Sequence, residues 1–419
     1  MFAYTTGGPF GMEEMVTTSG PGLTLIYLLV IPFFWCIPVS LVAAELTTAM
    51  PVEGGFYRWV RASYGNFWGF LAGWWNWSAS WLLGATYAVL FSDYLAIYFR
   101  ALTGWKHYVV SLALIAILAY INIRGIQMVG VVSTILELSV LIPVLLLCVI
   151  AATQWHHNPF HPFTPPHVPP FQVFGVGLAL GLWLYSGYEQ CSSVAEEIDN
   201  PRRSYPLALA IVVPLSLAVY FLPAFFSLAA PGNWQDWNTA YLSTAARLIG
   251  GNWLGFLMTL AATLGNASLL NATVLTSTRM PSTMAEDGYL PPVFAAKHPK
   301  FGTPWIAILI SSAIYALLAF HTLAQLLTVY VWLRTLVTVL TVLSAWRLRK
   351  KFPELKRPFV IPWGSAGLLY VVIAPILMGI LALVCSDPFA LKWGPLPVLF
   401  GVLLYFAFPK LKSLANPPS

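Results

Sequence analysis

Long apolar stretches separated by short polar connections make up most of this chain. A membrane-spanning helix needs roughly 20 predominantly apolar residues. Eleven stretches are close to that length or longer, and Met1–Ser19 would make a twelfth. The eleven are Leu23–Met50, Phe67–Phe99, Tyr108–Ile123, Met128–Thr153, Phe171–Val194, Leu207–Ala230, Trp253–Thr278, Trp305–Phe320, Leu323–Trp346, Leu368–Val384 and Pro395–Phe408. The pattern predicts an all-α integral membrane protein with about 12 transmembrane helices.

The first span is short and interrupted. Only the letters MFAYTT precede its break, so we interpret the chain as beginning late and this helix as truncated; a protein that truly lacks half of this helix is the alternative. The break consists of Gly7, Gly8, Pro9, Phe10 and Gly11, and the acids Glu13 and Glu14 follow it. Proline removes a backbone donor and glycine weakens a helix. We expect unwound backbone here whose peptide groups meet a ligand; an ordinary kink is the alternative.

The sixth span is interrupted in a similar way. Ser186 and Gly187 break it, and Tyr188 and Glu189 follow at once. An ionisable residue beside a broken helix at membrane depth is a candidate binding residue. Because the two breaks are five spans apart, we expect a five-plus-five inverted repeat with substrate held between them. Its halves would be residues 1–153 and 171–346, with two additional helices in 359–411.

Composition narrows the class of protein. Of 419 residues, 58% are hydrophobic and 9% are charged, against about 25% charged in soluble domains, so a soluble fold is excluded. The net charge of +6 is attributed to loops beside anionic lipid and not to nucleic-acid binding. The four cysteines are scattered singly, and no nucleophile–base set stands out. We therefore expect no cofactor, no metal and no enzymatic activity.

The basic residues predict the orientation. With a cytoplasmic N-terminus, sixteen of the 21 Lys and Arg residues fall in inner loops and four in outer loops. This asymmetry follows the positive-inside rule. We expect a multi-pass protein of the cell membrane (plasma or inner membrane) with both termini cytoplasmic.

Several other residues, most of them within the spans, are candidates for functional or packing roles. Glu137 and Glu189 are candidates for proton coupling, because burial favours the protonated carboxyl; for Glu137 a structural hydrogen bond to a neighbouring helix is an equal alternative. Arg334 is the expected counter-ion of one of these acids. Glu197 and Arg203 are inner-gate candidates. Glycine pairs at four-residue spacing, Gly69/Gly73 and Gly177/Gly181, are interpreted as helix-packing positions.

Several motifs together resemble the amino acid–polyamine–organocation superfamily of transporters, over nearly the whole chain. GGPFGMEE (7–14) is similar to the first-helix break of its polyamine-uptake and cationic amino acid branch. YSGYEQCSSVAEEIDNPRRSYP (185–206) resembles the sixth-helix signature. PVSLVAAELTTAMPVEGGFYRWV (38–60), INIRG (121–125) and STRMPSTMAEDGYLPPVFAAKHPKFGTP (277–304) resemble further segments of the same branch.

The resemblance implies alternating access around a central site between the breaks of helices one and six, with helices three and eight as walls. By position, Tyr87 is similar to the aromatic residue of the third helix, and Tyr188 with Glu189 to the aromatic–acid pair of the sixth. One departure concerns helix five, where some proton-coupled members carry a lysine. Here that position is Val140, with Glu137 one turn earlier, so a carboxylate would have to carry the proton.

These observations predict a secondary active transporter for amino acids or polyamines, with a cationic substrate favoured and a proton as coupling ion. Glu189 would pair with the substrate ammonium, and Phe10, Tyr87 and Tyr188 would stack on its chain. A transporter or exchanger of neutral amino acids, in which Glu189 handles protons only, is the alternative within transport. A nutrient sensor that binds without transporting is the alternative from another class.

Overall fold

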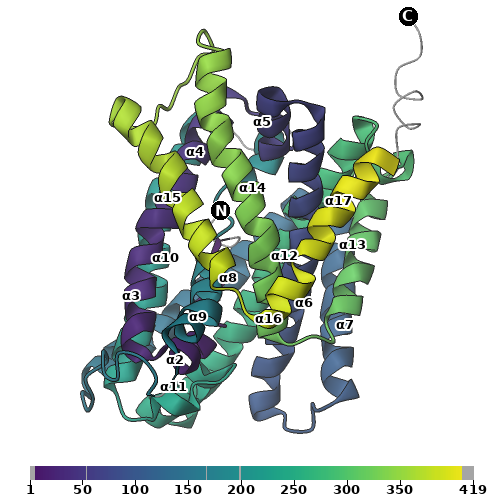
Figure 1. Ribbon diagram of the computed structural model, residues 1–419. Helices are drawn as coiled ribbons and strands as arrows, with labels where there is room; N and C mark the ends of the chain where they lie inside the picture. Colours follow the sequence, from purple (N-terminus) through teal and green to yellow (C-terminus); the bar gives the residue numbers. More distant parts are fainter. Residues whose placement is uncertain (1–4, 53, 167, 198–199, 408–419) are drawn as a thin grey trace, which may run out of the picture.

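A computed structural model of the protein is shown in Figure 1. Its backbone is described at residues 5–52, 54–166, 168–197 and 200–407, and its side chains at the same residues except 126–138, 170–172 and 194–197. Every regular element in these ranges is a helix. The predicted all-α class is therefore confirmed.

The helices follow the predicted spans. The first half has α2 (Glu13–Ser19), α3 (Pro21–Ile31), the π-helical turn η1 (Pro32–Cys36), α4 (Ile37–Ala49), α5 (Gly55–Tyr64), α6 (Asn66–Tyr98), α7 (Trp105–Arg124) and α8 (Ile126–Ala152). The second has α9 (Pro170–Leu184), η2 (Gln190–Glu197), α10 (Pro201–Ala229), η3 (Trp234–Asp236), α11 (Tyr241–Gly250), α12 (Asn252–Glu286), η4 (Pro292–Ala295), α13 (Trp305–Leu318), α14 (Leu323–Lys351), α15 (Gly364–Val384), α16 (Pro388–Trp393) and α17 (Pro395–Ala407). Among the described residues, eight helical segments are long and apolar enough to cross a membrane, and three shorter apolar helices accompany them. These correspond one for one to the eleven predicted spans, and the protein is a multi-pass membrane protein.

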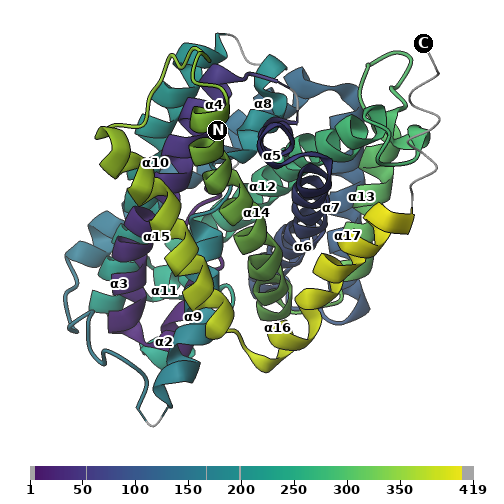
Figure 2. The same cartoon turned by 45° about the horizontal axis from the view of Figure 1, so that its top comes forward.

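Helices α6, α12 and α14 form the centre of the bundle (Figures 1 and 2). About 72% of the apolar window of α14 and 67% of that of α12 are buried, against 17% for the α16–α17 segment. α6 packs on both α12 and α14. Most side chains on these three helices therefore lie in the interior, whereas α16 and α17 lie at the periphery.

The glycine pairs occupy close helix contacts, as predicted. A Cβ on Gly73 of α6 would lie 2.6 Å from the sulfur of Met284 on α12. Gly69, Gly177 and Gly181 are equally short of space for a methyl group. Small residues let two helix backbones approach closely in a membrane protein, and these four positions do so here.

One end of the bundle, at the top of Figure 1, carries the ion pairs of Arg58, Arg61 and Arg349; we call it the basic end. Asp287, just after α12, accepts from Arg58 at 2.6 Å and from Arg61 at 2.5 Å, both on α5. The Tyr57 hydroxyl donates to the same carboxylate at 2.6 Å. Burial, together with this hydrogen bond, raises the pKa of the Tyr57 phenol well above its usual value, so the hydroxyl remains a donor.

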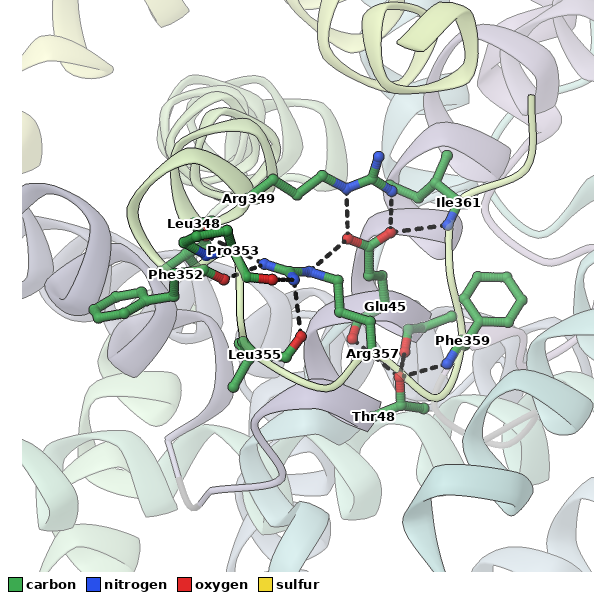
Figure 3. A network of polar contacts seen from close by, with 11 residues as sticks. Glu45, Thr48, Leu348, Arg349, Phe352, Pro353, Leu355, Arg357, Phe359 and Ile361 are labelled. Atoms are coloured by element: carbon green, nitrogen blue, oxygen red, sulfur yellow. Dashed lines mark hydrogen bonds and ion pairs between the residues drawn. The ribbon is translucent and has the colours of Figure 1, made fainter. Parts of the chain in front are cut away.

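A second carboxylate at the basic end ties three segments together (Figure 3). Glu45 of α4 is fully buried and forms a two-pronged ion pair with Arg349 of α14, whose Nε lies 2.8 Å from Oε1. Arg357 approaches the same carboxylate at 3.5 Å, and the Ile361 amide donates to it at 2.8 Å. This network joins α4, α14 and the connection that precedes α15.

Candidate functional site

Both predicted helix breaks are confirmed. In the first span residues 6–12 are not helical and α2 begins at Glu13, and α9 ends at Leu184, well before the end of the predicted Phe171–Val194 helix. Gly8, Gly11 and Gly187 have φ of 94°, 88° and 103°. These are left-handed backbone conformations that favour glycine over residues with a side chain. The glycines therefore allow the chain to turn where a helix would continue.

The two breaks meet at a small cavity. Its lining comes from α6, α9, α10, α12 and both breaks, and consists of Thr5, Gly7, Gly8, Phe10, Tyr87, Trp183, Leu184, Ser186, Tyr220 and Leu269. The cavity volume is about 20 Å³, which is room for roughly one water molecule. In this conformation the two breaks are closed against each other.

Aromatic rings provide much of the cavity wall. Tyr87 of α6 faces Trp183 of α9 at 6.2 Å between ring centroids, with the planes 34° apart. Phe10 meets Tyr94 edge-on at 5.2 Å. Tyr220 of α10 donates its hydroxyl to the Thr5 carbonyl at 3.2 Å. Rings of this kind bind both aliphatic chains and alkylammonium groups.

Helix α12 presses directly on the first break. A Cβ on Gly7 would lie 2.4 Å from Leu269 Cδ1, and a Cβ on Gly265 would lie 2.1 Å from the Gly7 carbonyl oxygen. Contacts below 3.0 Å require something to move, and a backbone oxygen moves less easily than the end of a side chain. The absence of a side chain at Gly265 thus positions the Gly7–Gly11 break.

Gly265→Ala is expected to displace the first break and reduce transport at least about tenfold. In an exposed helix interior this substitution would stabilise the protein by roughly 1 kcal/mol, so a loss of function would have to come from the clash with Gly7. Initial uptake rates, normalised to protein in the membrane, measure the effect. Leu260→Ala, at an exposed position of the same helix, is the matched control. Uptake equal in both variants would contradict the contact.

Glu189 lies deep in the bundle and forms an ion pair with Arg334 of α14. Each residue is only 2% exposed. Separating such a pair leaves an uncompensated charge and costs about 3–5 kcal/mol. Glu189 is thus the acid that pairs with the predicted counter-ion Arg334, a choice that the sequence left open. Glu189 is not among the residues that line the cavity.

The side-chain amides of Asn76 and Gln190 connect this ion pair to α6 by hydrogen bonds. Arg334 donates to the Asn76 side-chain oxygen at 3.3 Å. Gln190, next to Glu189, donates to the same oxygen at 2.6 Å, and Asn76 donates back to Gln190 at 3.3 Å. The sixth-span break, α6 and α14 therefore share one buried polar network. A movement of the break must rearrange this network.

Comparison with known families identifies the protein class. A family model described as amino acid permease matches residues 1–405. The chain belongs to the amino acid permease family. The motif resemblance to amino acid–polyamine–organocation transporters is thereby confirmed.

Relatives of the permease carry transporter names. A "probable polyamine transporter" of Arabidopsis thaliana is 32% identical over 388 residues, covering 92% of this chain and 80% of the relative. Polyamine transporter RMV1 of Arabidopsis thaliana is 31% identical over 388 residues (91% and 78%). Polyamine transporter PUT1 of Oryza sativa subsp. japonica is 31% identical over 381 residues (90% and 70%). The permease is accordingly a membrane transporter and not an enzyme.

Of the predicted substrate residues, Gly7, Gly8, Phe10, Tyr87 and Ser186 line the cavity of the permease. Pro9, Gly11, Gly187, Tyr188 and Glu189 belong to the same two breaks but are not among its lining residues. The Ser186 hydroxyl accepts from Trp35 Nε1 at 2.9 Å and donates to the Leu182 carbonyl at 2.5 Å. The lining contributions of Trp183, Tyr220 and Leu269 were not predicted.

Glu13 holds the first break in shape, a role that the sequence did not reveal. Its fully buried carboxylate accepts the Gly11 amide at 2.7 Å and the Leu242 amide at 3.4 Å. It also accepts the hydroxyl of Tyr94 from α6. The available signal was its place at the start of a helix, where carboxylates bind free backbone amides.

The remaining predicted residues are Glu137, Glu197 and Arg203. The side chains of Glu137 and Glu197 lie outside the described residues, so their proposed proton-coupling and gating roles stay predictions. Arg203 is exposed in the first turn of α10. The described ion pairs at the basic end are instead those of Asp287, Glu45 and Glu286, the last with Lys297 at 3.5 Å.

Proposed function

We propose that the permease transports small cationic amines, either polyamines or amino acids with a cationic side chain, by alternating access and in symport with protons. The observation that supports this most is the meeting of the two unwound segments at an aromatic-lined cavity with a buried acid on one of them. The names of the relatives point to the same substrate class.

Glu189 would supply the charge that recognises the substrate ammonium. In the described conformation its carboxylate is occupied by Arg334. A substrate ammonium that enters between the breaks would take the place of this guanidinium and keep the Glu189 carboxylate compensated. The aliphatic part of the substrate would lie against Phe10, Tyr87 and Tyr188, with exposed peptide groups at Gly7–Gly11 and Ser186–Gly187 around it.

The size of the cavity supports a conformational cycle. Roughly one water fits into about 20 Å³, whereas a diamine with a four-carbon chain needs several times that volume. Substrate entry therefore requires the two breaks to separate. Because Gln190 and Arg334 both bond to Asn76, separation would also loosen the polar network and free Glu189.

The proposal also includes the orientation of the permease in the membrane and its division into repeats. The basic end would face the cytoplasm of a cell bounded by the plasma or inner membrane, with both termini on that side. Residues 1–153 and 171–346 would be the two inverted repeats, with 359–411 as two additional helices. Glu137 and Glu189 are the proposed proton carriers, and Glu197 and Arg203 the inner gate.

An imposed proton gradient is expected to drive putrescine accumulation by purified permease in proteoliposomes, because the coupling acid must load a proton on the acidic side. Uptake of labelled putrescine should be several-fold faster with an acidic exterior than without a gradient, and a protonophore should abolish the difference. Unlabelled arginine and spermidine should compete, and alanine should not. Uptake that depends only on internal amino acid would instead identify an exchanger.

Transport of neutral amino acids is the second candidate. The Glu189–Arg334 ion pair favours it, because the pair is internally compensated and the lining residues that the structure describes include no ionisable acid or base besides tyrosine. Alanine would then compete in the same assay and putrescine would not.

A further inference from the structure

A second cavity lies away from the breaks, between α6, α14 and the α16–α17 segment. Its volume is about 310 Å³, at the lower end of the range of roughly 300–1,000 Å³ for small-molecule sites. Most of its lining is aliphatic or aromatic, and no Asp, Glu, Lys or Arg is among its lining residues. A charged ligand would be buried here without a counter-ion, which is costly. The cavity therefore suits a neutral, largely apolar molecule.

Two hydrogen-bond donors in this lining have no partner among the described residues. The Ser78 hydroxyl and the Trp81 indole N–H are buried, and neither forms a hydrogen bond within the described part of the chain. They are three residues apart on α6 and so lie on one face of the helix. Leaving a buried donor unsatisfied costs about 1–3 kcal/mol. An acceptor oxygen from outside the chain would satisfy both.

The neighbouring tryptophans of α6 do form hydrogen bonds through their indole N–H groups. Trp74 donates to the Pro397 carbonyl at 3.2 Å, and Trp77 donates to the Ser311 hydroxyl at 3.0 Å. Trp81 packs edge-on against both rings but keeps its N–H unpaired. The missing partner thus coincides with the residue that faces the cavity.

The rim of the cavity faces the membrane side of the bundle. Leu396 is 60% exposed, and Trp393 and His321 are exposed beside it. Leu396 and Trp393 belong to Pro388–Ala407, a candidate membrane span of which 17% is buried. A ligand dissolved in the bilayer can reach such a rim directly.

We propose that this cavity binds a neutral amphiphile from the membrane, with its aliphatic body against Leu82, Leu326 and Val329 and one acceptor oxygen at Ser78 and Trp81. Such a ligand would join α6 and α14, which carry the Asn76–Arg334 contact, to the peripheral α16–α17 segment. The acceptor is an alcohol oxygen or an ester carbonyl oxygen, supplied by a small solute or by a lipid ester group.

Photolabelling of the purified permease in nanodiscs tests this site. The probe is octanol carrying a diazirine, and mass spectrometry locates its adducts. We expect saturable labelling on α6, α14 and α16–α17 that unlabelled octanol displaces and octane does not, because octane lacks the oxygen. Labelling that rises linearly with probe and spreads over all lipid-facing helices would overturn the proposal, and so would equal displacement by octane.

Bilayer chemistry separates the two sources of the oxygen. If a lipid ester group occupies the cavity, ester-linked phosphatidylcholine should compete with the probe and ether-linked phosphatidylcholine should compete less. If a small solute is the occupant, saturable labelling should be equal in both bilayers. Either result supports the site and identifies its ligand.

Two variants examine the contacts. Ser78→Ala/Trp81→Phe keeps an aromatic ring in the lining but removes both donors, and should weaken octanol binding about tenfold, the loss expected for about 1.4 kcal/mol. Leu326→Trp should fill the cavity and abolish saturable labelling, whereas Leu309→Trp at an exposed position of α13 should not. Should Leu326→Trp fail to fold, the comparison of octanol with octane on the unaltered protein decides.

Discussion

Glu189→Gln is expected to abolish uptake of cationic substrates while the protein remains in the membrane. Glutamine keeps the size and hydrogen-bonding capacity of the side chain but removes the charge that we assign to ammonium recognition. Losing about 3 kcal/mol of buried charge–charge attraction corresponds to an about 100-fold weaker apparent affinity. Labelled putrescine uptake at sub-saturating concentration measures the loss.

The Glu189→Gln substitution also affects Arg334, and a double variant controls for this second effect. Glu189→Gln alone leaves Arg334 buried without its partner, which costs about 3–5 kcal/mol and reduces thermal stability. In Glu189→Gln/Arg334→Gln both charges are removed, so stability should recover while uptake does not. Recovery of uptake together with stability would show that Glu189 serves the fold and does not recognise substrate.

Arg334→Gln is expected to lower the KM for putrescine about tenfold and to lower the maximal rate. In the unaltered permease the substrate must displace a tethered guanidinium from Glu189. Removing this internal competitor favours binding, and tenfold corresponds to about 1.4 kcal/mol. Release should slow, because no guanidinium is left to replace the departing ammonium. The split between KM and maximal rate is measured in proteoliposomes.

A purely structural role for Arg334 would give another result. Both kinetic parameters would then worsen for every substrate alike, and Arg334→Lys, which keeps the charge, would rescue them. Competition at Glu189 further predicts that putrescine raises the melting temperature of Arg334→Gln more than that of the unaltered protein. In the variant the substrate supplies the only counter-ion proposed for Glu189, and ligands of the native state stabilise it.

Features that depend on local backbone chemistry were predictable from the sequence. Apolar length located the spans, and glycine and proline located the two breaks, because neither signal needs a tertiary partner. Gly8, Gly11 and Gly187 indeed adopt left-handed conformations. The membrane depth of Glu189 was predicted from its place directly after the break of an apolar span.

Contacts between distant segments were not predictable in the same way. The register of α12 against the first break places Gly265 on Gly7, and no local pattern marks that glycine. Arg334 was recognised as a buried counter-ion, but the choice among several acids depends on how α14 lies against the sixth-span break. Pairing of Glu45 with Arg349, more than 300 residues away, likewise results from the assembled bundle.

The central claim, that Glu189 recognises a substrate ammonium, is tested most directly by ligand-induced thermal stabilisation of the purified permease. Putrescine and arginine should raise the melting temperature of the unaltered protein in a concentration-dependent way, and alanine should not. Neither amine should stabilise Glu189→Gln/Arg334→Gln, in which both charges are absent. Stabilisation of that double variant by putrescine at the same concentrations would contradict the account. So would stabilisation of the unaltered protein by alanine and not by putrescine or arginine.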